Sequence, residues 1–318
     1  MELRHLGHSG LAVSSLALGT MSWGMDDTDE DDAAEQLRIY IEAGGNFIDT
    51  ADVYAGGASE AIVGRLTNSV VNRDDVYIAT KAVMRWESDR PRRADASRRH
   101  LLRELDQSLA RLQTSYLDLW QLHDWDGATP LEETMSALDV AVSSGRVRYV
   151  GVSNYSGWQT AKAATYQRSW PGRATLVSNQ VEYSLLQRYI EAEIVPAAID
   201  SGMGILPWSP LGRGVLTGKY RGGTPADSRG ASPQWDRFVK PYLDERANGI
   251  VGSVMTAADG LGVAPVAIAL AWVRDRPGVV APIVGARTAA QLRGSLSAAT
   301  LQLPDEIRDA LDEVSAPE

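Results

Sequence analysis

Four ionisable residues lie where short apolar runs end. Asp49 and Tyr54 stand five residues apart at the end of the run that begins at Gly45, while Lys81 and His123 each close a later run. Runs of this length with mostly apolar and β-branched residues are typical of buried strands. The pattern therefore predicts an acid, a phenol, an amine and an imidazole on three neighbouring strand ends, which is a proton-donating site.

The four side chains have distinct uses in such a site. A tyrosine is a weak acid, with an ordinary pKa of about 10, so the phenolate that forms when it gives up a proton must be stabilised. The Lys81 ammonium would favour the phenolate of Tyr54, and Asp49 would hold that ammonium by an ion pair. His123 would donate a hydrogen bond to a substrate carbonyl oxygen and support the negative charge that develops there.

The elements that must position these residues alternate between strands and amphipathic helices. Helical spacing links Leu101, Leu105, Leu109 and Leu112, and Gly44, Gly145 and Gly202 close helices where a left-handed residue is favoured. Eight strands with helices between them favour a single (β/α)₈ TIM barrel over residues 1–318, whose active residues lie at strand carboxyl ends. The expected strands are 16–20, 46–50, 76–81, 117–122, 147–153, 175–181, 204–208 and 279–284.

Segments outside this repeat predict two additions to the barrel. Residues 3–13 carry Gly7 and Gly10 around a turn, which predicts a small hairpin that seals the barrel floor. Residues 304–314 place Ile307, Leu311 and Val314 on one face, which predicts an extra packing helix at the carboxyl end.

Composition excludes several classes of function. The 318 residues carry a net charge of −10, which disfavours nucleic acid and anionic membranes as partners, although arginines between 85 and 103 could bind an anion. Cysteine is absent, and the four histidines lack the spacing of metal ligands, so we expect neither disulfides nor a metal. The first residues do not read as a signal peptide and no apolar run approaches a membrane span, so we expect a cytoplasmic protein.

Several ordered motifs closely resemble the aldo-keto reductase superfamily, in particular its bacterial members near the channel beta subunits and general stress proteins. The resemblance spans nearly the whole chain and rests on these segments: 18–21, 46–54, Lys81, 151–154, 179–186, 208–214 and 282–288. It implies NADPH-dependent reduction of an aldehyde or ketone, with Asp49, Tyr54, Lys81 and His123 as the catalytic residues and Tyr54 as the general acid.

The resemblance also implies a set of cofactor contacts. Ser153, Asn154 and Gln180 would hold the nicotinamide carboxamide, and Trp208 stands where many members have a tyrosine that stacks on the ring. Residues 212–240 would form a mobile cover over the pyrophosphate. The complete set is Gly19, Thr20, Met21, Asp49, Ser153, Asn154, Gln180, Trp208, Ser209, Pro210, Leu211, Gly212, Arg213, Gly214, Lys219, Gly285, Arg287, Gln291 and Ser295.

Two details of this set concern phosphate. The glycines from Gly212 to Gly218 fit neither the Rossmann spacing nor a P-loop, because Tyr220 stands after Lys219 where a P-loop needs Ser or Thr. Arg287 at the start of the helix after the last strand suits the 2′-phosphate of NADPH. In the resembled subgroup an asparagine contacts adenine at the position of Ser295, and the shorter serine puts that contact in doubt.

Substrate identity is less constrained by the sequence. Trp23, Trp86 and Trp125 follow three of the expected strands and could line an apolar mouth together with Tyr54 and His123. Two other functions stay open at this point: a lyase or isomerase that uses Lys81 as a Schiff-base amine, and a cofactor-binding redox sensor or regulatory subunit with little turnover. The oligomeric state cannot be read from these residues.

Overall fold

Eight parallel strands form a nearly closed barrel in the computed structural model, which describes residues 1–25, 28–85, 93–226, 228–232 and 236–317. The strands are hydrogen-bonded in the order β11-β10-β9-β8-β5-β4-β3-β12, and a parallel bridge between Ile205 and Val279 joins the two ends. They are β3 (Ala17–Gly19), β4 (Phe47–Asp49), β5 (Tyr77–Ala82), β8 (Leu117–Leu122), β9 (Val147–Ser153), β10 (Leu176–Glu182), β11 (Gly204–Trp208) and β12 (Ile283–Gly285). The predicted TIM barrel is confirmed.

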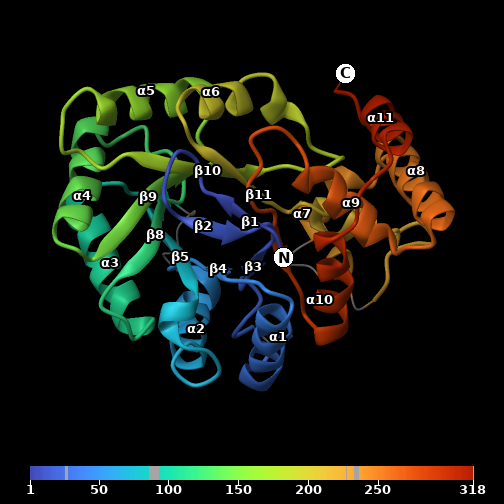
Figure 1. Cartoon of the computed structure of the whole chain (residues 1–318), viewed down its shortest axis with the longest axis horizontal. Helices are drawn as coiled ribbons and strands as arrows, with labels where there is room; N and C mark the ends of the chain where they lie inside the picture. Colours follow the sequence, from blue (N-terminus) through green and yellow to red (C-terminus); the bar gives the residue numbers. More distant parts are fainter. Residues whose placement is uncertain (26–27, 86–92, 227, 233–235, 318) are drawn as a thin grey trace.

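Helices surround the barrel, as Figure 1 shows. They are α1 (Glu30–Glu42), α2 (Ala58–Leu66), α3 (Arg98–Arg111), α4 (Leu131–Ser143), α5 (Gly157–Arg168), α6 (Ile194–Asp200), α7 (Asp236–Val239), α8 (Glu245–Leu261), α9 (Pro265–Arg274), α10 (Ala289–Leu296) and α11 (Asp305–Val314). Shorter elements include the 3₁₀ turns η1 (Tyr54–Gly57), η4 (Gly212–Thr217) and η6 (Lys240–Tyr242), and an antiparallel pair of β6 (Met84–Arg85) with β7 (Arg93–Ala94).

The predicted hairpin covers the amino ends of the barrel strands. Strands β1 (Leu3–His5) and β2 (Ala12–Ser14) pair antiparallel and cross the barrel in Figure 1. Gly7 at the turn has a φ of 57°, and a Cβ there would lie 2.5 Å from the carbonyl oxygen of Gly202, just before β11. Because the buried side chains of Leu6 and Leu11 pack into the cluster inside the barrel, the hairpin seals the floor.

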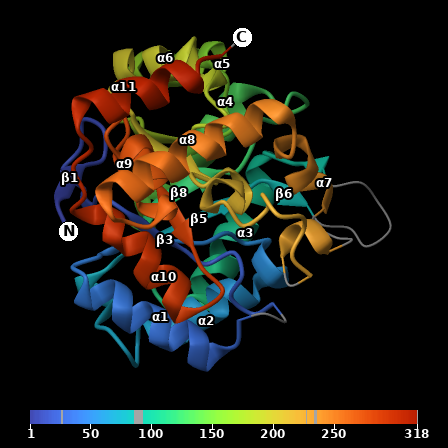
Figure 2. The same cartoon turned by 90° about the vertical axis from the view of Figure 1, so that its right-hand side faces the viewer.

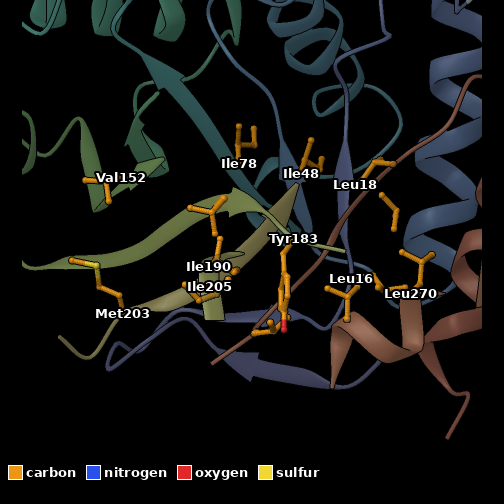
Figure 3. Close-up of a cluster of buried hydrophobic side chains, with 14 of the residues drawn as sticks. Leu16, Leu18, Ile48, Ile78, Val152, Tyr183, Ile190, Met203, Ile205 and Leu270 are labelled. Carbon is orange, nitrogen blue, oxygen red and sulfur yellow. The ribbon is translucent and has the colours of Figure 1, made fainter. Parts of the chain in front are cut away.

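Side chains alternate between the inside and the outside of the barrel along each strand. Phe47 and Ala79 belong to the cluster that fills the barrel, whereas the intervening Ile48 and Ile78 join the larger cluster shared with the helices (Figure 3). With a period of two, the next inward positions on β4 and β5 are Asp49 and Lys81. The strands therefore deliver these polar groups to the inside of the barrel at its carboxyl end.

The last strand is shorter than expected. The sequence predicts residues 279–284, but Val279 makes only the isolated bridge to Ile205, and the paired strand begins at Ile283. Pro282 lies between them and has no N–H group to donate to a neighbouring strand. Its carbonyl oxygen still accepts a hydrogen bond from the Ala17 N–H at 2.9 Å.

The carboxyl-terminal helix is an addition to the barrel, as predicted. Figure 2 shows α11 beside α8, and the indole N–H of Trp272 on α9 donates to Asp312 Oδ1 on α11 at 2.7 Å. Within the described ranges, no single helix is long and apolar enough to cross a membrane; α8 and α9 satisfy that test only as a pair, and they are bent by 104° at their junction.

Candidate active site

The structure brings the four residues of the predicted catalytic set to the carboxyl end of the barrel. Asp49 ends β4, Lys81 is the next-to-last residue of β5, His123 follows β8 and Tyr54 begins η1. The Lys81 ammonium lies 5.2 Å from the centre of the Tyr54 ring. The Tyr54 and His123 rings meet edge to face, with centroids 6.0 Å apart.

Asp49 and Lys81 form a buried ion pair. Lys81 Nζ donates to Asp49 Oδ2 at 2.7 Å and to the Thr50 carbonyl oxygen at 2.8 Å, and the Lys81 side chain is fully buried. Burial opposes the ammonium charge, but the attraction of Asp49 and Tyr54 outweighs it and holds the pKa of Lys81 above its ordinary value. Lys81 therefore remains a cation beside the phenol.

A second network joins the loops after β8, β9 and β11. The side chain of Asn154 donates from Nδ2 to the His123 carbonyl oxygen at 2.9 Å, and its Oδ1 accepts the indole N–H of Trp208 at 3.0 Å. The His123 N–H in turn donates to the Ala82 carbonyl oxygen at 2.8 Å. These bonds fix the backbone that carries His123 relative to β5 and to Trp208.

Two further residues of the predicted cofactor set connect to Asp49. Gln180 Nε2 donates to Asp49 Oδ1 at 2.8 Å, so both carboxylate oxygens of Asp49 are occupied. Ser153 Oγ donates to the Gln180 carbonyl oxygen at 2.8 Å. The structure thus gathers Ser153, Asn154, Gln180 and Trp208 around the same end of the barrel as the ion pair.

Strained backbone is concentrated at the same end. In the described parts of the chain six non-glycine residues have positive φ, and five of them follow strands β4, β5, β9 and β11: Ala55, Val83, Asn154, Ser209 and Arg213. Val83, with φ of 121° two residues beyond Lys81, is the most unusual because a β-branched side chain crowds its own backbone there. Such strain is characteristic of functional sites.

The chain turns sharply after β11. Gly212, Arg213 and Gly214 have φ angles of 54°, 58° and 92°, and the N–H groups of Gly212 and Gly214 donate to the carbonyl oxygens of Ser209 and Leu211 at 2.9 and 3.0 Å. Nε and Nη2 of Arg213 donate to Glu182 Oε1 and Oε2 at 3.1 and 2.9 Å. A carboxylate therefore already matches the charge of Arg213, and the turn is closed by its own hydrogen bonds.

The amino end of α10 carries the predicted adenosine-phosphate residues. Arg287 is half-buried just before the N-cap Thr288, and its N–H donates to Gln291 Oε1 at 3.0 Å. Ser295 is different, because it is only 4% exposed. Its hydroxyl therefore does not present a contact for adenine in this structure, in line with the departure from asparagine noted in the sequence.

The remaining predicted cofactor positions differ in accessibility. Gly19 and Thr20 are buried, and Thr20 Oγ1 is bonded to Ser59 Oγ at 2.8 Å and to the Asp49 carbonyl oxygen at 3.2 Å. The structure therefore does not present the Thr20 hydroxyl to a ligand. Lys219 and Gly285 are exposed, Met21, Ser209 and Leu211 are half-buried, and Pro210 is buried.

The three predicted substrate tryptophans do not share one environment. Trp23 is fully buried, and its indole N–H donates to Gln36 Oε1 on α1 at 3.2 Å, so it packs under the helix instead of lining the mouth. Trp125 is half-buried and meets Tyr155 and Trp158 edge to face at 5.1 and 5.4 Å. Trp86 lies outside the described residues.

Sequence reasoning missed several residues of this region. Trp158, 55% exposed at the start of α5, extends the aromatic surface of Trp125. Glu182 holds Arg213, and it lies two residues after Gln180, where an acid at the end of a strand is the only signal in the sequence. No three histidine or carboxylate side chains within the described ranges are grouped to hold a metal ion.

Comparisons with known proteins agree with this geometry. The model of the aldo/keto reductase family matches residues 15–316. The chain is 36% identical to the uncharacterized oxidoreductase YrpG of Bacillus subtilis, with 99% of this chain and 96% of that protein covered. It is 33% identical to a probable voltage-gated potassium channel subunit beta of Arabidopsis thaliana, over 94% and 91% of the two chains. It is also 33% identical to the norsolorinic acid reductase stcV of Emericella nidulans, over 94% and 77%.

Proposed function

The chain belongs to the aldo/keto reductase family, and we propose that it reduces an aldehyde or ketone to the alcohol with NADPH as the reductant. The observation that supports this best is the meeting of Tyr54 with the buried Lys81–Asp49 ion pair and with His123 at one end of the barrel. When bound, NADPH would supply the hydride for the carbonyl carbon.

Tyr54 is the proposed general acid. As the carbonyl carbon is reduced, its oxygen gains negative charge and takes the phenolic proton. The Lys81 ammonium, 5.2 Å from the ring centre, stabilises the phenolate left on Tyr54. Asp49 holds that ammonium at 2.7 Å and keeps it charged in a site from which water is excluded.

His123 is the proposed group that orients the substrate oxygen. Its edge-to-face arrangement with Tyr54 places an imidazole and a phenol around one position, where a carbonyl oxygen could accept hydrogen bonds from both. The Asn154 bond to the His123 carbonyl oxygen holds the backbone of this loop. Trp125, with Trp158 beside it, would form an aromatic wall for the rest of the substrate.

The residues near the ion pair fit a nicotinamide. Asn154 and Trp208 are half-buried at two strand ends, and Trp208 offers an indole face for stacking. Ser153 and Gln180 are 1% and 2% exposed and are bonded to each other and to Asp49, so they would support this face rather than contact the ring. Arg287 with the amino end of α10 fits the 2′-phosphate that distinguishes NADPH from NADH.

One alternative retains support. A relative bears the name of a potassium channel subunit, so the same fold could serve as a cofactor-binding regulatory subunit with little turnover. The lyase or isomerase alternative has less support, because a Schiff-base lysine must react as the neutral amine. Lys81 is fully buried against Asp49 and has a raised pKa, which disfavours the neutral form.

The test compares wild type with Tyr54→Phe in NADPH oxidation across a panel of aldehydes, ketones, quinones and keto sugars. We expect Tyr54→Phe to lose about 10²–10⁴-fold in kcat, because that is the usual contribution of a general acid, with little change in NADPH binding measured by fluorescence titration. Equal rates for the two proteins would refute the assignment of Tyr54. Tight NADPH binding without turnover on any carbonyl would favour the regulatory subunit.

A further inference from the structure

Asp52 is a buried acid on the segment that leads to Tyr54, and the chemistry proposed above does not use it. It is only 7% exposed. Its N–H donates to the Lys81 carbonyl oxygen at 3.1 Å, and the Tyr54 N–H donates to the Ala51 carbonyl oxygen at 3.1 Å. Within the described part of the chain, the buried Oδ1 of Asp52 has no hydrogen-bond partner.

The positive charge near Asp52 is already matched by another carboxylate, Glu60, and does not neutralise an ionised Asp52 as well. Glu60 of α2 is fully buried, and its two oxygens accept from Thr80 Oγ1 and from Arg111 Nε, both at 2.6 Å. Arg111, whose positive charge acts on Asp52, therefore already has Glu60 as its carboxylate partner. Glu104 of α3, which is itself paired with Arg103 at 2.7 Å, adds a further negative charge. The largest effects of charge on Asp52 are those of Glu60, Glu104 and Arg111.

A carboxyl group in this position is more stable with its proton than without it. An ionised, buried carboxylate with an unbonded oxygen is costly, and a like charge nearby adds to the cost. Burial, reinforced by Glu60 and Glu104 and opposed by Arg111 and by a hydrogen bond from the Val53 N–H, raises the pKa of Asp52 to about 8. Asp52 is therefore mainly neutral at neutral pH.

We propose that Asp52 acts as a neutral carboxylic acid that positions the turn carrying Tyr54, and that its ionisation in alkaline solution loosens this turn and lowers activity. The positioning role rests on the reductase function proposed above. An ionised Asp52 would gain hydration by moving toward solvent, which strains its bond to the Lys81 strand. Because Tyr54 follows only two residues later, the phenol would then move relative to the Lys81 ammonium.

The first test measures stability, which does not depend on any enzyme activity. In the unfolded chain an aspartate loses its proton near its ordinary pKa of about 3.9, whereas folded Asp52 keeps its proton up to about pH 8. Between about pH 4 and pH 8 the native state therefore binds one proton more than the unfolded state. Across this range the free energy of unfolding falls as the pH rises. Asp52→Asn resembles the neutral acid but does not titrate, so its stability lacks this dependence on pH.

We therefore expect Asp52→Asn to unfold at a higher temperature than wild type at about pH 8, with the difference shrinking toward about pH 4. Asp126→Asn is the control: Asp126 is half-buried, but it accepts from the Ala96 N–H at 2.9 Å and the Ala128 N–H at 2.8 Å, and its hydrogen bonds outweigh burial and hold its pKa below the ordinary value. That variant should unfold at a lower temperature at pH 8. An Asp52→Asn protein less stable than wild type at pH 8 would overturn the proposal.

Infrared spectroscopy of the wild-type protein gives a measurement that needs no variant. A buried, protonated carboxyl group absorbs apart from carboxylates, and this band should be present at about pH 6.5 and disappear above about pH 9, one unit beyond the pKa of Asp52. Absence of the band at neutral pH contradicts a neutral Asp52. Its loss over that interval supports the proposal.

The second test measures the positioning role. At one pH unit above its pKa only about a tenth of Asp52 is neutral, so the ratio of kcat near pH 9 to kcat near pH 6.5 should be up to about tenfold higher in Asp52→Asn than in wild type. Superimposable pH profiles would overturn the positioning role. If neither protein reduces any carbonyl while Asp52→Asn still gains stability at pH 8, the reductase function fails and the neutral state of Asp52 stands.

Discussion

Breaking the Lys81–Asp49 ion pair one side at a time should cost far more than removing both charges. Lys81→Met leaves the Asp49 carboxylate, whose side chain is 3% exposed, with only the Gln180 amide as a hydrogen-bond donor. An uncompensated buried charge of this kind costs about 3–5 kcal/mol of the free energy of unfolding. We expect that loss for Lys81→Met, and a similar one for Asp49→Asn, which leaves the Lys81 ammonium without its counter-ion.

The double variant Asp49→Asn/Lys81→Met carries no charge at either of these two positions. It loses the bonds from Lys81 Nζ to Asp49 and to the Thr50 carbonyl oxygen, and two hydrogen bonds at about 0.5–1.5 kcal/mol each amount to roughly 1–3 kcal/mol. The double variant should therefore be more stable than either single variant. The coupling energy from the four proteins should then be several kcal/mol, far above the few tenths expected for independent sites.

Urea unfolding followed by tryptophan fluorescence provides the measurement, since the chain contains nine tryptophans. Arg73→Met, Asp118→Asn and their double variant form the control cycle. Arg73 and Asp118 also form a largely buried pair at 2.6 Å, but near the amino end of β8 and away from Tyr54. The control pair should show coupling in stability without a loss of reductase rate.

Two results would contradict this reasoning. If the losses in the two single variants simply add in the double variant, Lys81 and Asp49 do not depend on each other for their charge. If Lys81→Met keeps the full rate of NADPH oxidation, the ammonium does not stabilise the Tyr54 phenolate. If the loss of the Lys81 ammonium raises the pKa of Tyr54 by one unit, the phenolate is less stable by about 1.4 kcal/mol, which corresponds to a tenfold lower rate.

Two further predictions concern the cofactor. Arg287→Ala should weaken NADPH binding by roughly tenfold or more, because a charge-assisted hydrogen bond contributes about 1.5–3 kcal/mol, while NADH binding should change little. Arg293→Ala is the control, since Arg293 is an exposed arginine on the same helix. Equal losses for both cofactors would rule out a contact between Arg287 and the 2′-phosphate. Glu182→Gln should weaken the bonds of Glu182 to Arg213 and to the Tyr242 hydroxyl, which donates to it at 2.9 Å, and should speed NADPH release in stopped-flow fluorescence. An unchanged release rate would mean that these bonds do not slow the exit of the cofactor.

Sequence patterns located the barrel because its strands are local features. The run 117–122 matches β8 at both ends, and 147–153 matches β9 at both ends. The error at β12 also has a local cause: Pro282 interrupts the pairing, although the apolar run continues through it. The two-residue pair β6 and β7 was not predicted, since segments this short have no periodicity to detect.

The sequence predicted which residues form the candidate site and which strands they follow. It did not predict the hydrogen bonds between their side chains. Lys81 and Asp49 are close because neighbouring parallel strands end together, which topology alone implies. The bond between Gln180 and Asp49 joins residues 131 positions apart and depends on side-chain directions across the barrel. Trp23 shows the opposite outcome. Its place after a strand suggested the mouth, but Gln36 of α1 provides a buried acceptor that no local spacing reveals.

Lys81 and Asp52 show why the charge of a buried group cannot be read from its position in the sequence. Both residues are buried. They lie on neighbouring segments, because the Asp52 N–H donates to the Lys81 carbonyl oxygen. Lys81 faces a carboxylate whose charge is otherwise unmatched, so it stays ionised. Asp52 faces Glu60, whose partner is already Arg111, so the stable form is the neutral acid. Burial disfavours the charged form of both groups, and of the two only Lys81 has an opposite charge that outweighs this effect.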